Sequence, residues 1–200
     1  MSIVTLNDRA VRSVTTFGSA NAGAMVFISK QTASSSATIS FTSGIDSTYK
    51  EYLFTFNNIH PATDNAQFLF QTSTDGGSNY NTTITSTFFY AYHFESGSTS
   101  ALAYDANMDQ AQGTSFQRIV DAIGSEADES MSGKLNIFNP SSTTFVKHYI
   151  SECNSYVDGT YTTRYMSAGY YNTTSAIDAV QFKMSSGNID AGDICLYGIL

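Results

Sequence analysis

Short segments in which aromatic residues occupy every second position recur through most of this chain, from residue 24 onward. In residues 51–56, the aromatic residues Tyr52, Phe54 and Phe56 fall on one face of an extended strand, because successive side chains on a strand point to opposite sides. An aromatic face of this kind needs a second layer to cover it. The repeat therefore predicts a protein made of packed β-sheets.

Residues 68–94 continue this pattern. Phe68 and Phe70 alternate in the same way, and residues 74–79 contain the Asp, Gly and Asn residues that tight turns use, so we expect a β-hairpin there. Residues 84–94 place apolar side chains on both faces, which indicates a central strand that packs on both sides. One face carries Phe88, Tyr90, Tyr92 and Phe94, and the other carries Phe89, Ala91 and His93.

Between residues 95 and 129 the alternation fades except in residues 116–120, so we expect long loops and one short strand there. Beyond residue 129 the pattern returns in five segments, residues 133–138, 144–150, 160–170, 179–184 and 194–200. Nine or ten short strands with turns between them and no helical stretch predict an all-β fold. The uneven connections favour an antiparallel jelly-roll-like β-sandwich over a simple meander.

The first 23 residues are a different kind of segment. Their apolar residues follow neither a period of 2 nor one of 3.6, and they end in a run of small residues. We interpret residues 1–23 as an extended N-terminal docking arm and hinge, and residues 24–200 as one β-sandwich domain; the alternative for the arm is a frayed terminus without a role. The residues expected to dock are Ile3, Leu6, Arg9, Val11, Arg12 and Val14.

The charge balance narrows the range of partners. Only 13% of the residues are charged and the net charge is −8, so the chain would repel nucleic-acid phosphates and anionic lipids. We therefore expect neither nucleic acid nor membrane as a partner. The chain has no apolar stretch of about 20 residues and no apolar signal-peptide core near its start, so we expect synthesis in a cytoplasm.

No arrangement of reactive residues indicates an enzyme, a metal site or a cofactor. His60, His93 and His148 lack metal-ligand spacing; we interpret His60 as a loop residue and the other two as histidines of the interior or of a groove. The chain has no GxSxG motif. Glu51, Glu95 and Glu152 could form a glycosidase-like pair, but with 17 acidic residues a chance pair is expected.

Three further features have both a functional and a structural interpretation. The acidic run at residues 121–129 and the pair Asp190 and Asp193 could hold calcium, but neither has an EF-hand pattern, and we favour a solvated loop and a tight turn. Cys153 and Cys195 are too far apart in sequence for a CxxC motif, so we expect reduced thiols in the core.

Strand and turn motifs stand out in three stretches of sequence: residues 4–18, residues 40–52 together with residues 60–64, and residues 186–198. Together these stretches resemble a family of small tailed-phage virion structural proteins of the marine and cyanobacterial phage type. The resemblance implies a non-enzymatic part of the particle, either a tail-fibre or baseplate appendage or a capsid decoration protein. It carries over no catalytic residue, since the matching motifs correspond to strands and turns.

Assembly in many copies agrees with the composition. A surface with few charges can be buried between subunits at little desolvation cost, and virion proteins associate symmetrically. We therefore expect a homotrimer located in the virion, with the arm bound to other virion proteins. The competing hypothesis is a carbohydrate-binding module for a host surface glycan, because aromatic faces stack on sugar rings. Its candidate residues are Tyr104, Tyr156, Tyr161, Tyr165, Tyr170 and Tyr171.

Overall fold

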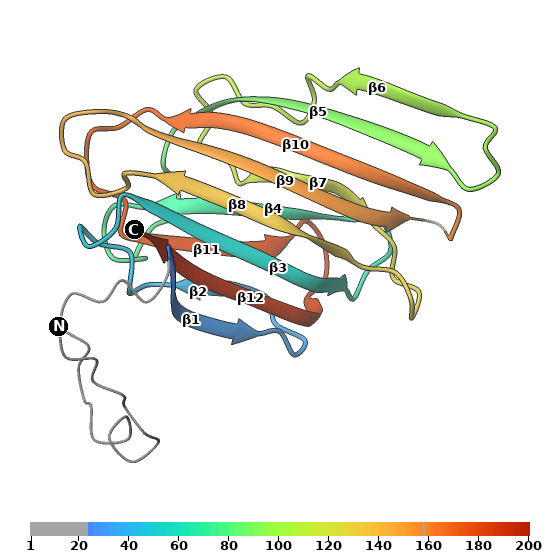
Figure 1. Cartoon of the computed structure of the whole chain (residues 1–200), viewed down its shortest axis with the longest axis horizontal. Coiled ribbons are helices and arrows are strands. Elements are labelled where there is room, and N and C mark those ends of the chain that lie inside the picture. Colours follow the sequence, from blue (N-terminus) through green and yellow to red (C-terminus); the bar gives the residue numbers. More distant parts are fainter. Residues whose placement is uncertain (1–23, 158) are drawn as a thin grey trace, which may run out of the picture.

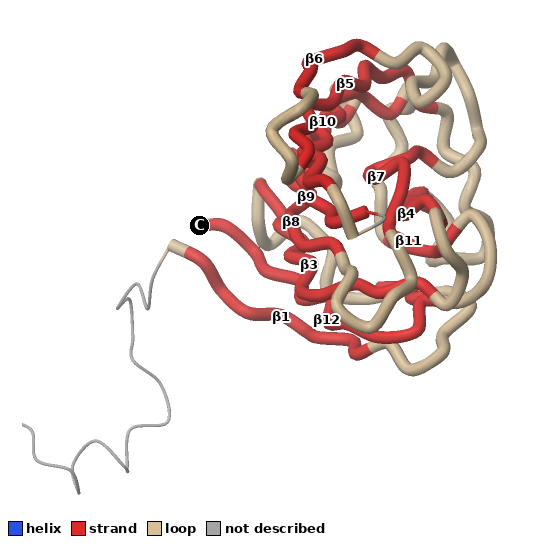
Figure 2. The backbone as a smooth tube through the Cα atoms, turned by 90° about the vertical axis from the view of Figure 1, so that its right-hand side faces the viewer, coloured by secondary structure: helices blue, strands red, loops and turns tan. Residues whose placement is uncertain are grey.

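Two antiparallel β-sheets face each other across an aromatic core (Figure 1, Figure 2). The structure is a computed structural model, and it describes residues 24–157 and 159–200. This part of the chain forms twelve strands and no helix. The strands are β1 (Met25–Thr32), β2 (Ile39–Phe41), β3 (Glu51–Pro61), β4 (Ala66–Ser73), β5 (Ile84–Phe94), β6 (Ser100–Tyr104), β7 (Gln117–Ile123), β8 (Met131–Phe138), β9 (Lys147–Val157), β10 (Tyr161–Tyr171), β11 (Ala179–Met184) and β12 (Ile189–Ile199).

The two sheets differ in size. The large sheet has eight strands in the order β1-β12-β3-β8-β9-β10-β5-β6, and the small sheet has four in the order β2-β11-β4-β7. The predicted all-β fold, with antiparallel sheets packed as a sandwich, is confirmed. A jelly roll has eight strands in two sheets, so the jelly-roll part of the prediction is not confirmed by this arrangement.

The core lies where the small sheet covers the large one. Tyr52, Phe54 and Phe56 are fully buried on β3, as their alternation predicted. The ring of Phe182 on β11 packs against five other rings, at centroid distances of 5.2 to 6.5 Å. These partners come from both sheets: Phe41, Phe54, Phe56, Phe68 and Phe70.

The predicted hairpin between β4 and β5 is wrong. The turn itself forms as expected, because the Asp75 carboxylate accepts hydrogen bonds from the side chains of Asn79 and Ser73. These hydrogen bonds lower the pKa of Asp75 to about 2. However, β4 pairs with β11 and β7, whereas β5 pairs with β10 and β6. The connection carries the chain from the small sheet to the large one, because turn residues determine the local backbone and not the pairing of the strands that follow.

Three other expectations need correction. β5 is not central but lies one strand from the edge, and only one of its faces is packed, since His93 on the other face is exposed. The region of residues 95–129 holds two strands rather than one, because β6 pairs with β5 and forms the edge of the large sheet. β6 consists of small and apolar residues and has no aromatic alternation. His60 lies within β3 and not in a loop.

Candidate functional site

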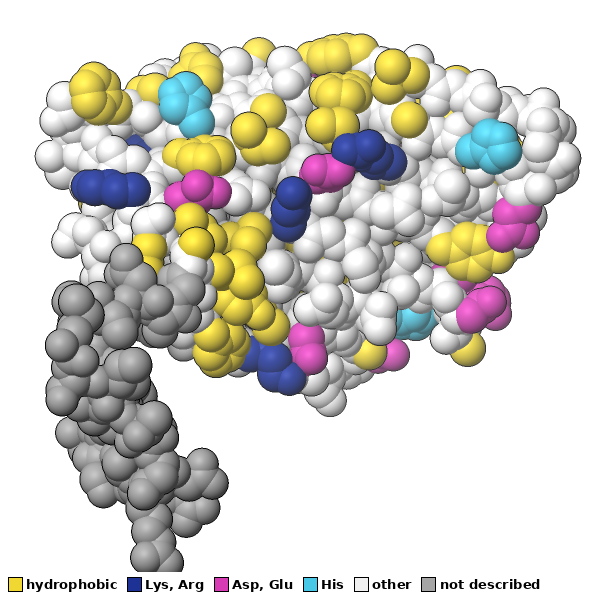
Figure 3. Space-filling model, in the orientation of Figure 1, with side chains coloured by type: hydrophobic (Ala, Val, Ile, Leu, Met, Phe, Trp, Pro, Cys, Tyr) yellow, Lys and Arg dark blue, Asp and Glu magenta, His cyan; other side chains and the backbone are white. Residues whose placement is uncertain are grey.

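The outer face of the large sheet is the broad surface that points away from the small sheet (Figure 3). Its strands carry three cations and four carboxylates, so its charge is nearly balanced although the whole chain has a net charge of −8. The cations are Lys30, Lys134 and Arg164, and the carboxylates are Glu51, Glu152, Asp190 and Asp193. Most of the negative charge of the chain therefore lies outside this face.

Large apolar side chains are exposed at both margins of the outer face. At the β1 edge, Met25 and Phe27 are 50% and 57% exposed, and the Phe27 ring packs edge to face on Tyr197 of β12. At the β6 edge, Leu102 and Tyr104 are 73% and 56% exposed. Figure 3 shows hydrophobic side chains gathered along these two margins, at the top and at the lower left. Large exposed apolar patches of this kind indicate interaction surfaces.

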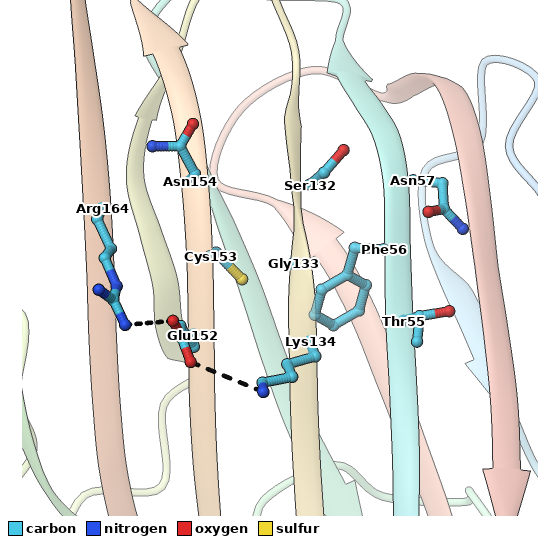
Figure 4. Close-up of a pocket in the computed structure, with 10 residues that line it drawn as sticks. All are labelled: Thr55, Phe56, Asn57, Ser132, Gly133, Lys134, Glu152, Cys153, Asn154 and Arg164. Carbon is cyan, nitrogen blue, oxygen red and sulfur yellow. Dashed lines mark hydrogen bonds and ion pairs between the residues drawn. The ribbon is translucent and has the colours of Figure 1, made fainter. Parts of the chain in front are cut away.

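A polar hollow of about 500 Å³ lies in the middle of this face (Figure 4). Glu152 on β9 forms ion pairs with Arg164 on β10 and with Lys134 on β8. The distance from Lys134 Nζ to Glu152 Oε2 is 3.7 Å. All three side chains are partly exposed to solvent, so these pairs contribute little to stability. Their effect is to neutralise charge across three neighbouring strands.

The thiol that lies beside the hollow is not activated. It belongs to Cys153 and is buried in the core, and burial raises its pKa to about 12. A thiol with this pKa is protonated at neutral pH and therefore unreactive. Both Cys153 and Cys195 are free and buried, as the sequence predicted.

A second cavity, of about 460 Å³, opens on the inner face of the large sheet beside the edge strand β7, and we call it the aromatic cleft. The register of β5 and β10 pairs Phe94 with Tyr161 and Tyr90 with Tyr165, so these side chains share one face. Tyr92 lies between Tyr90 and Phe94 on the same face of β5, because residues two apart on a strand point the same way.

The five rings of the aromatic cleft form a continuous tract. Along β5, the ring centroids of Tyr90 and Tyr92 are 6.2 Å apart, and those of Tyr92 and Phe94 are 5.8 Å apart. Across to β10, Phe94 stacks on Tyr161 at 4.8 Å, and Tyr90 lies 6.3 Å from Tyr165. Aromatic tracts with a few polar groups beside them are typical of ligand sites.

The cleft exists because the small sheet is narrower than the large one. At the near end of β5, Ile84 and Phe88 are fully buried under the small sheet. Further along the same face, Tyr90, Tyr92 and Phe94 are only partly buried. The aromatic alternation of β5 thus continues past the strand β7, where the covering layer ends.

The six candidate tyrosines fall into three places. Tyr161 and Tyr165 line the aromatic cleft. Tyr104, Tyr156 and Tyr170 occupy strand positions that point to the outer side of the large sheet. The prediction that Tyr171 faces a ligand is wrong, because this residue is fully buried against Phe70 and Tyr149.

Three residues that line the cleft, Tyr90, Tyr92 and Phe94, are not among the candidate residues predicted from the sequence. Their alternation predicts a shared face but places that face in the core along its whole length. The signal that could have distinguished them is the pairing of β5 with β10, which brings Tyr161 and Tyr165 beside them. Pairing of strands so distant in sequence is not encoded in local alternation.

The docking residues of the arm lie outside the described residues. His93 and His148 are exposed on the large sheet, so the prediction of interior or groove histidines is wrong; each lies at an outward position of its strand. Asp190 accepts a hydrogen bond from Ser35, whereas Asp193 forms an ion pair with Lys30, so each carboxylate has its own protein partner.

The acidic run contains one buried carboxylate. Glu129 is 2% exposed and accepts hydrogen bonds from the backbone N–H groups of Glu126 and Gly159. These bonds hold the turn after β7 against the end of β9. Within residues 24–157 and 159–200, no group of three or more His, Cys, Asp or Glu side chains is arranged to hold a metal ion. The same residues include no helix with the length and hydropathy needed to cross a membrane.

Comparison of the chain with known proteins identified no relative. No protein-family model, no curated protein and no solved structure matches this chain. The resemblance to tailed-phage virion proteins therefore stays a prediction. Function has to be inferred from the two surfaces of this molecule, the outer face and the aromatic cleft.

Proposed function

We propose that this chain is a non-enzymatic structural subunit of a tailed-phage particle, either a tail-fibre or baseplate appendage or a capsid decoration protein. In this proposal it is made in the host cytoplasm and enters the virion as a homotrimer. Residues 1–23 dock on other virion proteins, and the sandwich points outward. The observation that carries the proposal is the outer face of the large sheet, with its nearly balanced charge and its apolar margins.

Charge explains why this face suits association with further copies of the chain. Like-charged copies with a net charge of −8 repel each other unless the contacting surfaces are close to neutral. On the outer face, the ion pairs of Lys30 with Asp193 and of Glu152 with its two cations are already formed within one subunit. Burying this face in a trimer would therefore desolvate few unpaired charges.

Association through the outer face can be tested with variants of its apolar margins. Burying a Leu or Phe side chain contributes about 1.5–3 kcal/mol, so we expect Phe27→Ser and Leu102→Ser each to weaken trimer formation about tenfold or more. Sedimentation equilibrium at micromolar concentration should give the molar mass of a trimer for the wild type. Phe145→Ser is the matched control, since Phe145 is 69% exposed in the loop before β9. A monomeric wild type, or equal effects of all three variants, would contradict the proposed interface.

The docking role of the arm predicts a separation between folding and assembly. We expect a chain that lacks residues 1–20 to keep the circular-dichroism spectrum and the thermal unfolding transition of the full chain. The truncated chain should nevertheless be absent from purified particles when it is produced during infection by the phage that encodes the protein. Incorporation at the level of the full chain would refute the docking role.

A second candidate function, a carbohydrate-binding module for a host surface glycan, is favoured by one observation. The aromatic cleft presents four partly exposed rings, Tyr90, Tyr92, Phe94 and Tyr161, beside the nearly buried ring of Tyr165. Binding of glycans by the isolated protein tests this candidate, and particle incorporation does not depend on it.

A further inference from the structure

The aromatic cleft contains polar atoms that the described protein does not satisfy. Thr163 is 2% exposed and lines the cleft; its Oγ1 makes no hydrogen bond of normal geometry to a described residue, although it lies close enough to the Tyr165 hydroxyl to oppose the rise that burial causes in the pKa of that group. A buried hydroxyl without a partner is costly, so native proteins rarely leave one unless a water or a ligand completes it. Thr163 therefore has unused hydrogen-bonding capacity at the cleft, which a water or a ligand hydroxyl would complete.

Asp121 of β7 provides a second polar group at the cleft. Its Oδ1 accepts a hydrogen bond from Gln67 Nε2 at 3.0 Å, and no other described residue donates to either of its carboxylate oxygens. Gln67 in turn accepts a hydrogen bond from Arg118 Nε at 2.9 Å, which fixes the position of this side chain. Asp121 therefore stands as an oriented acceptor, with Oδ2 available, opposite the aromatic tract.

We propose that the aromatic cleft binds a neutral oligosaccharide, whose pyranose rings stack on the tract of rings and whose hydroxyl groups hydrogen-bond to Asp121 and Thr163. A pyranose has apolar C–H faces and a polar rim of hydroxyls, and the cleft offers aromatic faces beside two polar atoms. This inference rests on the second candidate function, carbohydrate binding, and not on the assembly role.

The geometry favours this ligand over two others with an affinity for aromatic residues. An anionic sugar or a nucleotide would meet the Asp121 carboxylate and a chain of net charge −8. A quaternary ammonium ion is bound by rings that surround one point. Here, instead, Tyr90, Tyr92 and Phe94 follow each other along one strand, as an extended ligand of several rings requires.

A glycan array followed by calorimetry tests the proposal on the full chain. The array should carry neutral glucans, xylans, mannans and galactans as well as sialylated and sulfated glycans, and choline chloride should be titrated separately. We expect binding to at least one neutral glycan and none to the anionic glycans or to choline. Loss of one ring or of the carboxylate should weaken binding about tenfold, measured with Tyr92→Ala and Asp121→Asn.

Two controls distinguish whether the protein binds carbohydrate at all from whether it binds carbohydrate in the aromatic cleft. Asp121→Asn keeps the shape of the side chain, so a loss of binding with an unchanged thermal transition is not a folding defect. Tyr104→Ala removes an exposed tyrosine of the outer face and should leave affinity unchanged. If no neutral glycan binds at millimolar concentration, carbohydrate binding itself is wrong. If a glycan binds but Tyr104→Ala weakens it and the two cleft variants do not, the function stands and the aromatic cleft is the wrong site.

Discussion

Replacing Phe182 by alanine is expected to lower the free energy of unfolding by about 3–5 kcal/mol, the range observed for buried Phe→Ala changes. Phe182 is fully buried on β11 of the small sheet, and its ring contacts rings of both sheets. Its loss removes the contact of β11 with Phe54 and Phe56 of β3 and leaves a cavity that rings held by two sheets cannot fill.

Urea unfolding followed by far-ultraviolet circular dichroism measures this effect. Phe145→Ala is the matched control, because Phe145 has the same side chain but is 69% exposed. We expect the control to change the free energy of unfolding by less than about 0.5 kcal/mol. Equal losses in both variants would mean that Phe182 does not join the two sheets.

Between pH 10 and pH 12 the protein is expected to lose much of its stability. Burial raises the pKa of Tyr149 to about 12 and that of Tyr165 to about 12, from the ordinary value of 10.0. In the unfolded chain both phenols ionise near pH 10, so in this range the folded state binds more protons than the unfolded state. The free energy of unfolding therefore falls as the pH rises from 10 to 12, and below pH 10 these groups cause no loss.

The size of this loss follows from the pKa values. A rise from 10.0 to about 12 corresponds to roughly 2–3 kcal/mol for each tyrosine, against a total stability of about 5–15 kcal/mol for a typical domain. Burial also raises the pKa of Tyr171, which adds to the loss, whereas burial lowers the pKa of Lys147, which opposes it.

Urea titrations at pH 8 and pH 11.5 measure the alkaline loss. Tyr149→Phe keeps the ring but removes one ionisable group, so the difference between the two pH values should shrink in this variant by roughly 2 kcal/mol. A wild type that is as stable at pH 11.5 as at pH 8 would contradict the burial of these hydroxyls.

Much of the fold could be predicted from alternation alone, because aromatic residues at every second position give a strand one apolar face, which a second layer has to cover. The segment at residues 179–184 coincides with β11, and the inward residues of β3 are the predicted ones. Twelve strands form where nine or ten are predicted, and β1, β2 and β6 are not among the predicted segments. The sequence of β6 consists of small and apolar residues without aromatic alternation, and its place comes from pairing with β5. Which sheet each strand joins was equally out of reach, as the connection from β4 to β5 shows.

The candidate site was only partly predictable, for a related reason. Tyr161, Tyr165 and Tyr171 have the same parity in sequence and do share one face of β10. Their surroundings differ because the small sheet covers Tyr171 and ends before Tyr161. The width of a covering sheet results from long-range pairing, so no local pattern separates the buried Tyr165 and Tyr171 from the partly exposed Tyr161.

The most direct test of the proposed role is to look for the chain in the particle. In the proposed role the chain is encoded by a tailed phage, and purified particles of that phage are to be examined by quantitative mass spectrometry and by cryo-electron microscopy. We expect the chain in a copy number divisible by three, with the sandwich visible on the outside of the tail or capsid. Its absence from purified particles, while the protein is abundant in the infected cells, would contradict a structural role in the virion.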